Sequence, residues 1–112
     1  MSLAGQDVTV LGAGIAGLAV ARALALKGAR VRIVEQADTI QEVGAGLQIS
    51  PNGGRVIEAL GLGERLEAGS MASGAVVLRE HRRGDAVLRM SLAGRGRFAL
   101  AHRADVISVL EQ

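Results

Sequence analysis

The first part of the chain carries two hydrophobic periods, one after the other. Val8, Val10 and Leu11 form a short apolar run rich in β-branched residues, which predicts a strand buried on both faces, as in parallel sheets. Apolar residues then recur at helical spacing over residues 15–27, with Arg22 on the opposite side. The apolar positions of this helical period are Leu18, Ala21, Leu24 and Ala25.

A glycine and a second apolar run follow this predicted helix. Lys27 and Gly28 supply a basic last turn and a glycine stop. The alternating stretch RVRIVE at residues 30–35 then predicts a second strand. A strand, a helix and a strand of these lengths predict the right-handed βαβ crossover of an α/β fold. We therefore expect a Rossmann-like unit with a parallel sheet.

The middle of the chain predicts one more helix. After a glycine-punctuated connection, Ser50 is placed to cap a helix, Pro51 to begin it and Gly61 to close it. The expected buried side of this helix consists of Val56, Ile57 and Leu60. The stretch GERLEAG that follows predicts a short turn.

The last third predicts a β-hairpin, a short strand and a helix. Residues 75–92 contain two apolar runs around the polar turn Arg83-Gly84-Asp85, a pattern typical of a hairpin. AGRGR predicts a loop and FALAH a short strand. In the final helix, one face carries Val106, Ile107 and Leu110, and no stop signal precedes the last residue of the sequence. We therefore expect an incomplete domain.

Composition limits the classes of function. With 112 residues, 49% hydrophobic and 21% charged, the chain is expected to form one small globular domain at most. Phe98 is the single aromatic residue, so these residues cannot build a pocket that stacks on a planar ring. The lack of cysteine excludes disulfides, thiolate metal sites and a cysteine nucleophile, and it fits an intracellular protein. His81 and His102 lie far apart without ligand spacing, so we predict no metal site.

Charge and hydropathy suggest no nucleic-acid or membrane partner. The formal net charge is +2, and the arginines are partly scattered, without the aromatic platforms of single-strand-binding grooves. The uncharged stretch over residues 8–21 is too short to span a bilayer, and no signal-peptide pattern frames it. We therefore expect a cytoplasmic protein.

The motif Gly12-x-Gly14-x-x-Gly17 lies between the predicted first strand and helix. In this context the first glycine allows a tight turn, the second lets a pyrophosphate approach bare backbone, and the third lets helix and strand pack closely. Free N–H groups and the positive end of the helix dipole would face the phosphates. Glu35, at the end of the second strand, is placed to accept hydrogen bonds from ribose hydroxyls, which disfavours NADP. The pattern predicts a dinucleotide site.

This fingerprint alone does not choose between FAD and NAD, but the rest of the chain resembles one family. The segments GAGIAGLAVARALALKGARVRIVEQ, GAGLQISPNG followed by VIEALGLGERL, and HRADVISVL resemble, in this order, the N-terminal part of FAD-dependent aromatic hydroxylases. These are flavoprotein monooxygenases similar to salicylate and hydroxybenzoate hydroxylases. The resemblance implies that residues 1–112 are the N-terminal part of an FAD-binding domain, with the substrate domain and the C-terminal part absent.

The resemblance also implies a set of cofactor-binding residues. They are Gly12, Ala13, Gly14, Ile15, Ala16 and Gly17 at the pyrophosphate, Glu35 with Gln36 at the adenosine ribose, Gly46 near the flavin, and Arg103 toward the phosphate or ribityl region. Gly44 would likewise permit close backbone approach. In the complete enzyme, NADH or NADPH would reduce FAD, and a small aromatic substrate would be hydroxylated with O₂. No residue of this chain is predicted to be catalytic.

The chain also departs from the family pattern. The second cofactor motif, built around Gly-Asp, is absent, since Gly84-Asp85 falls in the predicted hairpin turn. We therefore expect the chain alone to be catalytically incompetent and to self-associate through uncovered apolar surface and strand edges. Two alternatives stay open: an NAD-dependent dehydrogenase or another flavin oxidoreductase, and a non-enzymatic module that binds nucleic acid or a partner chain.

Overall fold

The N-terminal part of the chain forms the predicted βαβ unit. The computed structural model describes residues 1–39 and 45–112. Strand β1 (Asp7–Leu11), helix α1 (Ile15–Leu26) and strand β2 (Arg30–Val34) follow one another, and the two strands pair in parallel throughout. Gly28 ends the helical segment with a φ of +97°, a conformation that glycine adopts without steric cost.

The small parallel sheet is covered on one face only. Helix α1 packs against this sheet with Leu18 and Ala21 buried, but Ala25, predicted to share this face, is exposed. Val8 and Val10 are half-buried, whereas Leu11 is 82% exposed. The prediction that the first strand is buried on both faces is therefore wrong, because side chains on the face away from α1 remain in solvent.

A second sheet is antiparallel and was only partly predicted. It has the order β3-β7-β4, in which the predicted short strand β7 (Phe98–His102) lies between β3 (Gly46–Ile49) and β4 (Met71–Ser73). The strands β3 and β4 were not predicted. They are short, and their pairing with β7 joins segments far apart in the sequence, which local patterns do not encode.

In the described part of the chain, three further helices follow, of which two were predicted and one was not. Helices α2 (Pro51–Ala59) and α4 (Arg103–Leu110) were predicted, although Val56 is 57% exposed instead of buried. The segment predicted as a turn is helix α3 (Gly63–Ala68). Its helical form is explained by packing, since Leu62 and Leu66 lie one turn apart and are both buried, and burial stabilises helices too short to form alone.

One hydrophobic core joins these elements. Its buried members are Ala13, Leu18, Leu60, Leu62, Leu66, Val106, Ile107 and Leu110. Arg22 of α1 donates from Nε to the carbonyl oxygen of Leu60, the C-cap residue of α2, at 2.7 Å. The glycine turn, through Ala13, is thus part of the same core as α4.

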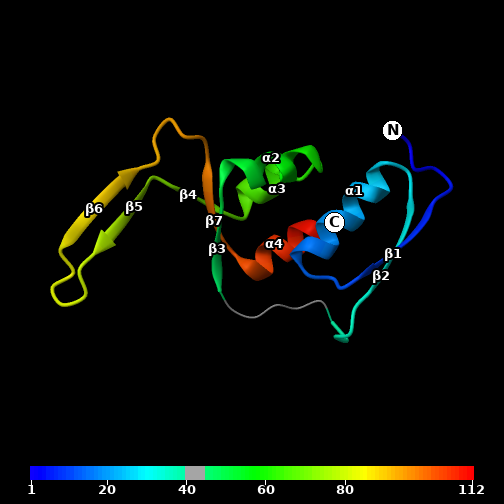
Figure 1. The fold of residues 1–112 in the computed structure, drawn as a ribbon, viewed down its shortest axis with the longest axis horizontal. Helices are drawn as coiled ribbons and strands as arrows, with labels where there is room; N and C mark the ends of the chain where they lie inside the picture. The colour runs from blue at the N-terminus through cyan, green and yellow to red at the C-terminus, as the bar shows by residue number, and fades with distance from the viewer. Residues whose placement is uncertain (40–44) are drawn as a thin grey trace.

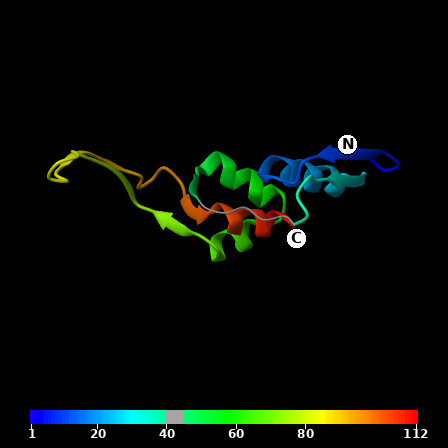
Figure 2. The same ribbon diagram turned by 90° about the horizontal axis from the view of Figure 1, so that it is seen from below.

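The predicted hairpin projects from the rest of the molecule. Strands β5 (Ala75–Arg79) and β6 (Ala86–Ser91) pair in antiparallel fashion, and every residue of β6 is exposed. Figures 1 and 2 show this hairpin at one end of the molecule and the βαβ unit at the other. The radius of gyration of 17.3 Å exceeds the roughly 13 Å expected for a compact domain of this length. The shape leaves apolar surface open on the hairpin.

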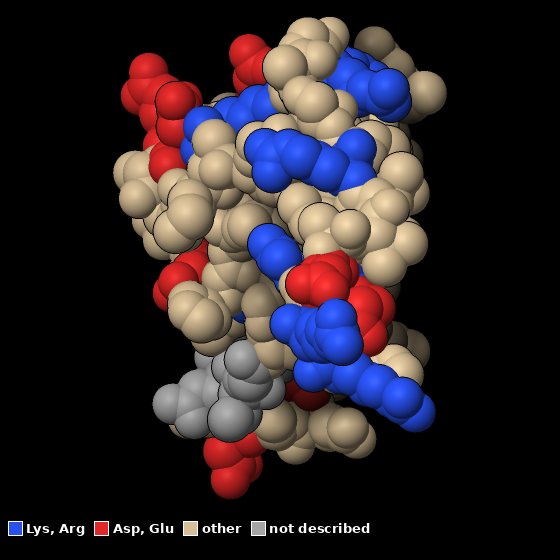
Figure 3. All heavy atoms as spheres, turned by 90° about the vertical axis from the view of Figure 1, so that its left-hand side faces the viewer, with Lys and Arg blue, Asp and Glu red and all other residues tan. Residues whose placement is uncertain are grey.

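The surface carries mixed charge. On the face viewed from the hairpin end, Lys and Arg side chains are interspersed with Asp and Glu (Figure 3). Within the part of the chain that the structure describes, no helix combines the length and hydrophobicity needed to cross a membrane.

Candidate functional site

The glycine motif forms a bend between β1 and α1. Gly12 follows β1 and has a φ of +100°, the left-handed region that favours glycine. Its N–H donates to the Val34 carbonyl oxygen at 2.7 Å and so continues the β1–β2 pairing by one bond. Gly12 therefore forms a tight turn directly after the strand, as predicted for the first glycine of the motif.

The other two glycines of the motif, Gly14 and Gly17, differ in whether the surrounding protein has space for a side chain. A Cβ atom at Gly17 would lie 2.0 Å from the Gly12 carbonyl oxygen, so the close passage of α1 over the bend requires glycine there. A Cβ atom at Gly14 would meet no heavy atom within 4 Å. The protein itself therefore does not require glycine at position 14, whereas a ligand approaching the backbone would.

The amides at the start of α1 lie next to this open space. Gly14 is the N-cap residue, and its carbonyl oxygen accepts from Leu18 N–H at 2.9 Å. Within residues 1–39 and 45–112, the N–H groups of Gly14, Ile15 and Ala16 have no acceptor. The first N–H groups of a helix lack intrahelical partners and carry the positive end of its dipole. This bend is therefore suited to an anion such as a phosphate.

The Ala13 amide has an acceptor inside the protein. Ala13 is 3% exposed, and its N–H donates to Glu35 Oε2 at 2.7 Å. Glu35 Oε1 accepts from Ala37 N–H at 3.2 Å. These N–H groups, with Ala13 contributing most, hold the pKa of the Glu35 carboxyl below its usual range. Sequence reasoning missed the Glu35–Ala13 contact, which joins residues 22 positions apart and has no local signal.

The remaining predicted residues lie at two other places. Gln36 is exposed directly after β2 and Glu35. Gly46 begins β3 opposite His102, and Arg103 begins α4 with its N–H donating to the Ala45 carbonyl oxygen at 3.0 Å. The structure thus places Gly46 and Arg103 close to each other, at the start of β3 and of α4. Gly44 lies outside the described residues.

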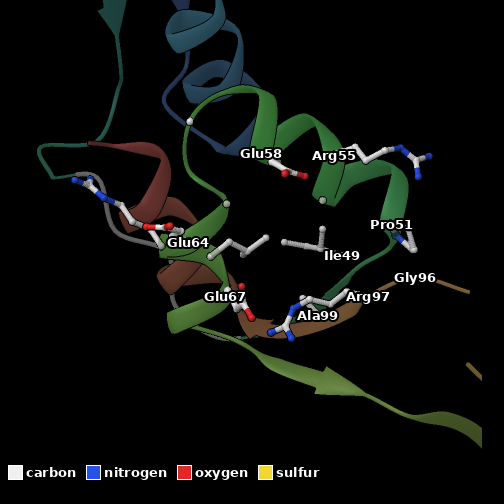
Figure 4. Close-up of a pocket in the computed structure, with 14 residues that line it drawn as sticks. Ile49, Pro51, Arg55, Glu58, Glu64, Glu67, Gly96, Arg97 and Ala99 are labelled. Carbon is white, nitrogen blue, oxygen red and sulfur yellow. The ribbon is translucent and has the colours of Figure 1, made fainter. Parts of the chain in front are cut away.

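Two hollows lie beside these elements. One of about 810 Å³ is bordered by Gly46, Gln48 and His102 on the exposed face of the three-stranded sheet. Another of about 650 Å³ lies between α2 and α3, where Ile49 points inward and Glu64 and Glu67 line the α3 side (Figure 4). This second hollow contains none of the predicted site residues.

The described residues offer no alternative metal centre. Among residues 1–39 and 45–112, no cluster of three or more histidine, cysteine, aspartate or glutamate side chains could hold a metal ion.

Comparisons with known proteins agree with this geometry. Residues 10–41 match the NAD(P)-binding Rossmann-like domain. The chain is 40% identical to 3-hydroxybenzoate 6-hydroxylase of Polaromonas naphthalenivorans (strain CJ2) over 111 residues, 93% of this chain and 28% of that protein. It is 39% identical to 3-amino-4-hydroxybenzoate 2-monooxygenase of Streptomyces cremeus over 105 residues, 88% of this chain and 27% of that protein.

Two solved structures of similar fold are an oxygenase and a protein in complex with FAD, and this chain again covers about a quarter of each. The tetrameric form of 2-methyl-3-hydroxypyridine-5-carboxylic acid oxygenase superposes with a TM-score of 0.87 at 28% identity, covering 95% of this chain and 28% of that one. Klebsiella pneumoniae HpxO in complex with FAD and uric acid gives a TM-score of 0.77 at 27% identity, covering 94% and 28%. The chain thus spans just over a quarter of the length of these four proteins.

Proposed function

We propose that the glycine bend binds the diphosphate of FAD, because the chain is similar over most of its length to hydroxybenzoate hydroxylases and related monooxygenases. On this proposal, residues 1–112 form the first part of an FAD-binding domain. The whole protein would hydroxylate a small aromatic substrate, as the names of its relatives state for them.

One observation carries the proposal. Gly14 has open space where a side chain would stand, and the N–H groups of Gly14, Ile15 and Ala16 lie at the N-terminal, positive end of α1. A structural bend needs glycine at Gly12 and Gly17, but nothing in the described protein needs it at Gly14. A pyrophosphate seated against bare backbone would need it.

The predicted residues have distinct parts in this proposal. Residues 14–17 would bind the diphosphate, Glu35 the adenosine ribose with Gln36 beside it, and Gly46 and Arg103 the part of the cofactor nearer the flavin. Gly12 shapes the bend, and Ala13 contributes its buried side chain and a hydrogen bond to Glu35. When bound, FAD supplies the redox chemistry of hydroxylation, with NADH or NADPH as reductant and O₂ as oxygen source. The chain's own task is to bind and orient the cofactor.

A second candidate function is nucleotide binding by an NAD-dependent oxidoreductase. The match of residues 10–41 to an NAD(P)-binding Rossmann-like domain favours it, because the opening βαβ unit is shared by both classes. Titration with NADH and FAD separates the two, since the second function requires the nicotinamide nucleotide to bind and FAD not to bind.

The direct test replaces Gly14 by valine. We expect Gly14→Val to lose binding of FAD and of ADP by at least about a hundredfold, because the added side chain fills the space for the diphosphate. The control is Gly74→Val, at a glycine between β4 and β5 whose Cβ would also meet nothing within 4 Å. Isothermal titration calorimetry measures both. Unchanged binding in Gly14→Val would refute the phosphate assignment.

Self-association and a cytoplasmic location belong to the same proposal. Val76, Leu78, Leu88 and Met90 stand opposite one another in pairs on one face of the hairpin, and all four are exposed. Such a cross-strand apolar face is prone to pair with another chain. Light scattering of the purified chain over a concentration series tests this, and a monomer at every concentration would contradict it.

A further inference from the structure

Glu35 makes a contact that ribose binding does not explain. Its carboxylate is held from two sides, by Ala13 N–H at 2.7 Å and by Ala37 N–H at 3.2 Å. Ala37 is close to Glu35 in sequence, but Ala13 lies inside the glycine bend. The side chain that follows β2 is therefore tied directly to the loop that follows β1.

The Ala13 amide depends on this carboxylate. Ala13 is 3% exposed and belongs to the hydrophobic core, so its N–H is withdrawn from solvent. A buried N–H needs an acceptor, and a charged acceptor gives a stronger bond than a neutral one. Without the Glu35 side chain, this donor would stay unsatisfied unless the bend moved toward water.

Two bonds together anchor the bend to β2. The Gly12 N–H donates to the Val34 carbonyl oxygen at 2.7 Å, and the next amide, of Ala13, donates to Glu35. Successive N–H groups are thus bonded to Val34, the last residue of β2, and to Glu35, the residue directly after it. The next amides, those of Gly14, Ile15 and Ala16, have no acceptor among the described residues and lie at the start of α1.

From this arrangement we infer that Glu35 is a positioning residue for the diphosphate site, holding the bend in its binding shape through the Ala13 amide. This inference rests on the proposed function of the bend. It adds to the ribose contact expected of Glu35, because it acts on phosphate binding through the protein backbone. The lowered pKa of the Glu35 carboxyl agrees, since the backbone donors favour its charged form.

A ligand without ribose hydroxyls separates the two roles of Glu35. We would measure the affinity of wild type and Glu35→Ala for ADP and for 2′,3′-dideoxyadenosine diphosphate by calorimetry. A positioning role predicts that Glu35→Ala weakens the dideoxy ligand by about tenfold and ADP by more. Unchanged affinity for the dideoxy ligand, with loss for ADP alone, would overturn the inference and leave only the ribose contact.

Glu80→Ala is the matched control. Glu80 also accepts two backbone N–H groups, those of Arg82 and Arg83, but it lies in the hairpin turn. Its removal should leave both affinities unchanged. An equal loss in Glu80→Ala would show that the effect of Glu35→Ala is general destabilisation, and this too would overturn the inference.

A readout without ligand keeps this inference separate from the proposed function. In ¹⁵N-resolved NMR spectra, the Ala13 amide of the wild type should shift as Glu35 titrates, and Glu35→Gln should abolish that transition while preserving the fold. If neither nucleotide binds the wild type, the proposed function fails, yet the Ala13 amide still reports on the contact. If the chemical shift of the Ala13 amide changed neither with pH nor in Glu35→Gln, the positioning role would be refuted.

Discussion

In each of two glycine-containing turns of this chain, a glutamate carboxylate accepts two backbone N–H groups, but the two turns differ in which backbone groups remain without a partner among the described residues. In the bend after β1, Glu35 accepts N–H groups of Ala13 and Ala37. In the turn between β5 and β6, Glu80 accepts N–H groups of Arg82, at 3.0 Å, and of Arg83. In both cases these donors lower the pKa of the carboxyl.

The difference lies in which backbone N–H groups of each turn still lack an acceptor, within the part of the chain described, once the glutamate is hydrogen-bonded. The hairpin turn is closed by its own residues, since Gly84 N–H donates to the Glu80 carbonyl oxygen at 3.1 Å and the Arg79 guanidinium to the Gly84 carbonyl oxygen at 2.8 Å. The bend after β1 is held from outside, by β2, and its later amides stay open. The proposed ligand site thus lies in the bend that a remote strand anchors, and not in the turn that its own residues close.

The largest effect expected from this comparison concerns the core beneath the bend. Leu62 is 1% exposed and shares its cluster with Ala13, so Leu62→Ala should lower the free energy of unfolding by about 2–5 kcal/mol. Leu88, on the projecting hairpin, is 57% exposed, and Leu88→Ala should change it by no more than about 0.5 kcal/mol. Urea denaturation followed by circular dichroism measures both. Equal losses would show that the two turns rest on equally packed regions.

A smaller effect distinguishes the glycines within the bend. Gly17→Ala forces a Cβ against the Gly12 carbonyl oxygen and should destabilise the fold by about 1–3 kcal/mol. Gly14→Ala places its Cβ in open space, and as an N-cap change it should cost less than about 1 kcal/mol. Thermal unfolding of the two variants side by side tests this order. A reversed order would mean that α1 does not pass over the bend as described.

The smallest effect is the dependence of stability on pH. Because the pKa of Glu35 and of Glu80 is lower in the folded chain, each carboxylate stabilises the fold above the ordinary glutamate pKa of about 4.3. That contribution is lost as pH falls through the lowered pKa. The urea midpoint of the wild type should therefore drop between about pH 6 and about pH 3 by more than that of Glu35→Gln or Glu80→Gln. Equal drops in all three proteins would count against both contacts.

Much of the fold could be predicted from local pattern. The βαβ order, the hairpin, and helices α2 and α4 follow from periods and stop signals over short windows. Helix α3 could not be predicted, because its six residues are helical through the burial of Leu62 and Leu66 against other helices. The exposure of Val56 and Leu11 was missed for the corresponding reason, since the period marks an apolar face but not whether another element covers it.

The candidate site also combines features that the sequence predicted with contacts that only the tertiary structure shows. Gly12, Gly14, Gly17 and Glu35 were predicted as site residues from their spacing and their place after a strand. The resemblance implied a cofactor role for Gly46 and for Arg103 separately, and only the pairing of β3 with β7 shows that the two residues are neighbours. The bond from Ala13 to Glu35 had no signal in the sequence.

By itself, the sequence determined where this chain can turn and where bare backbone is available, because glycine spacing and short-range hydrophobic period act within a few residues. Only the tertiary structure decided which backbone amides are used by the protein and which are left for a ligand. That division depends on β2 lying beside β1 and on α1 packing over the bend, contacts between residues that chain order alone does not bring together.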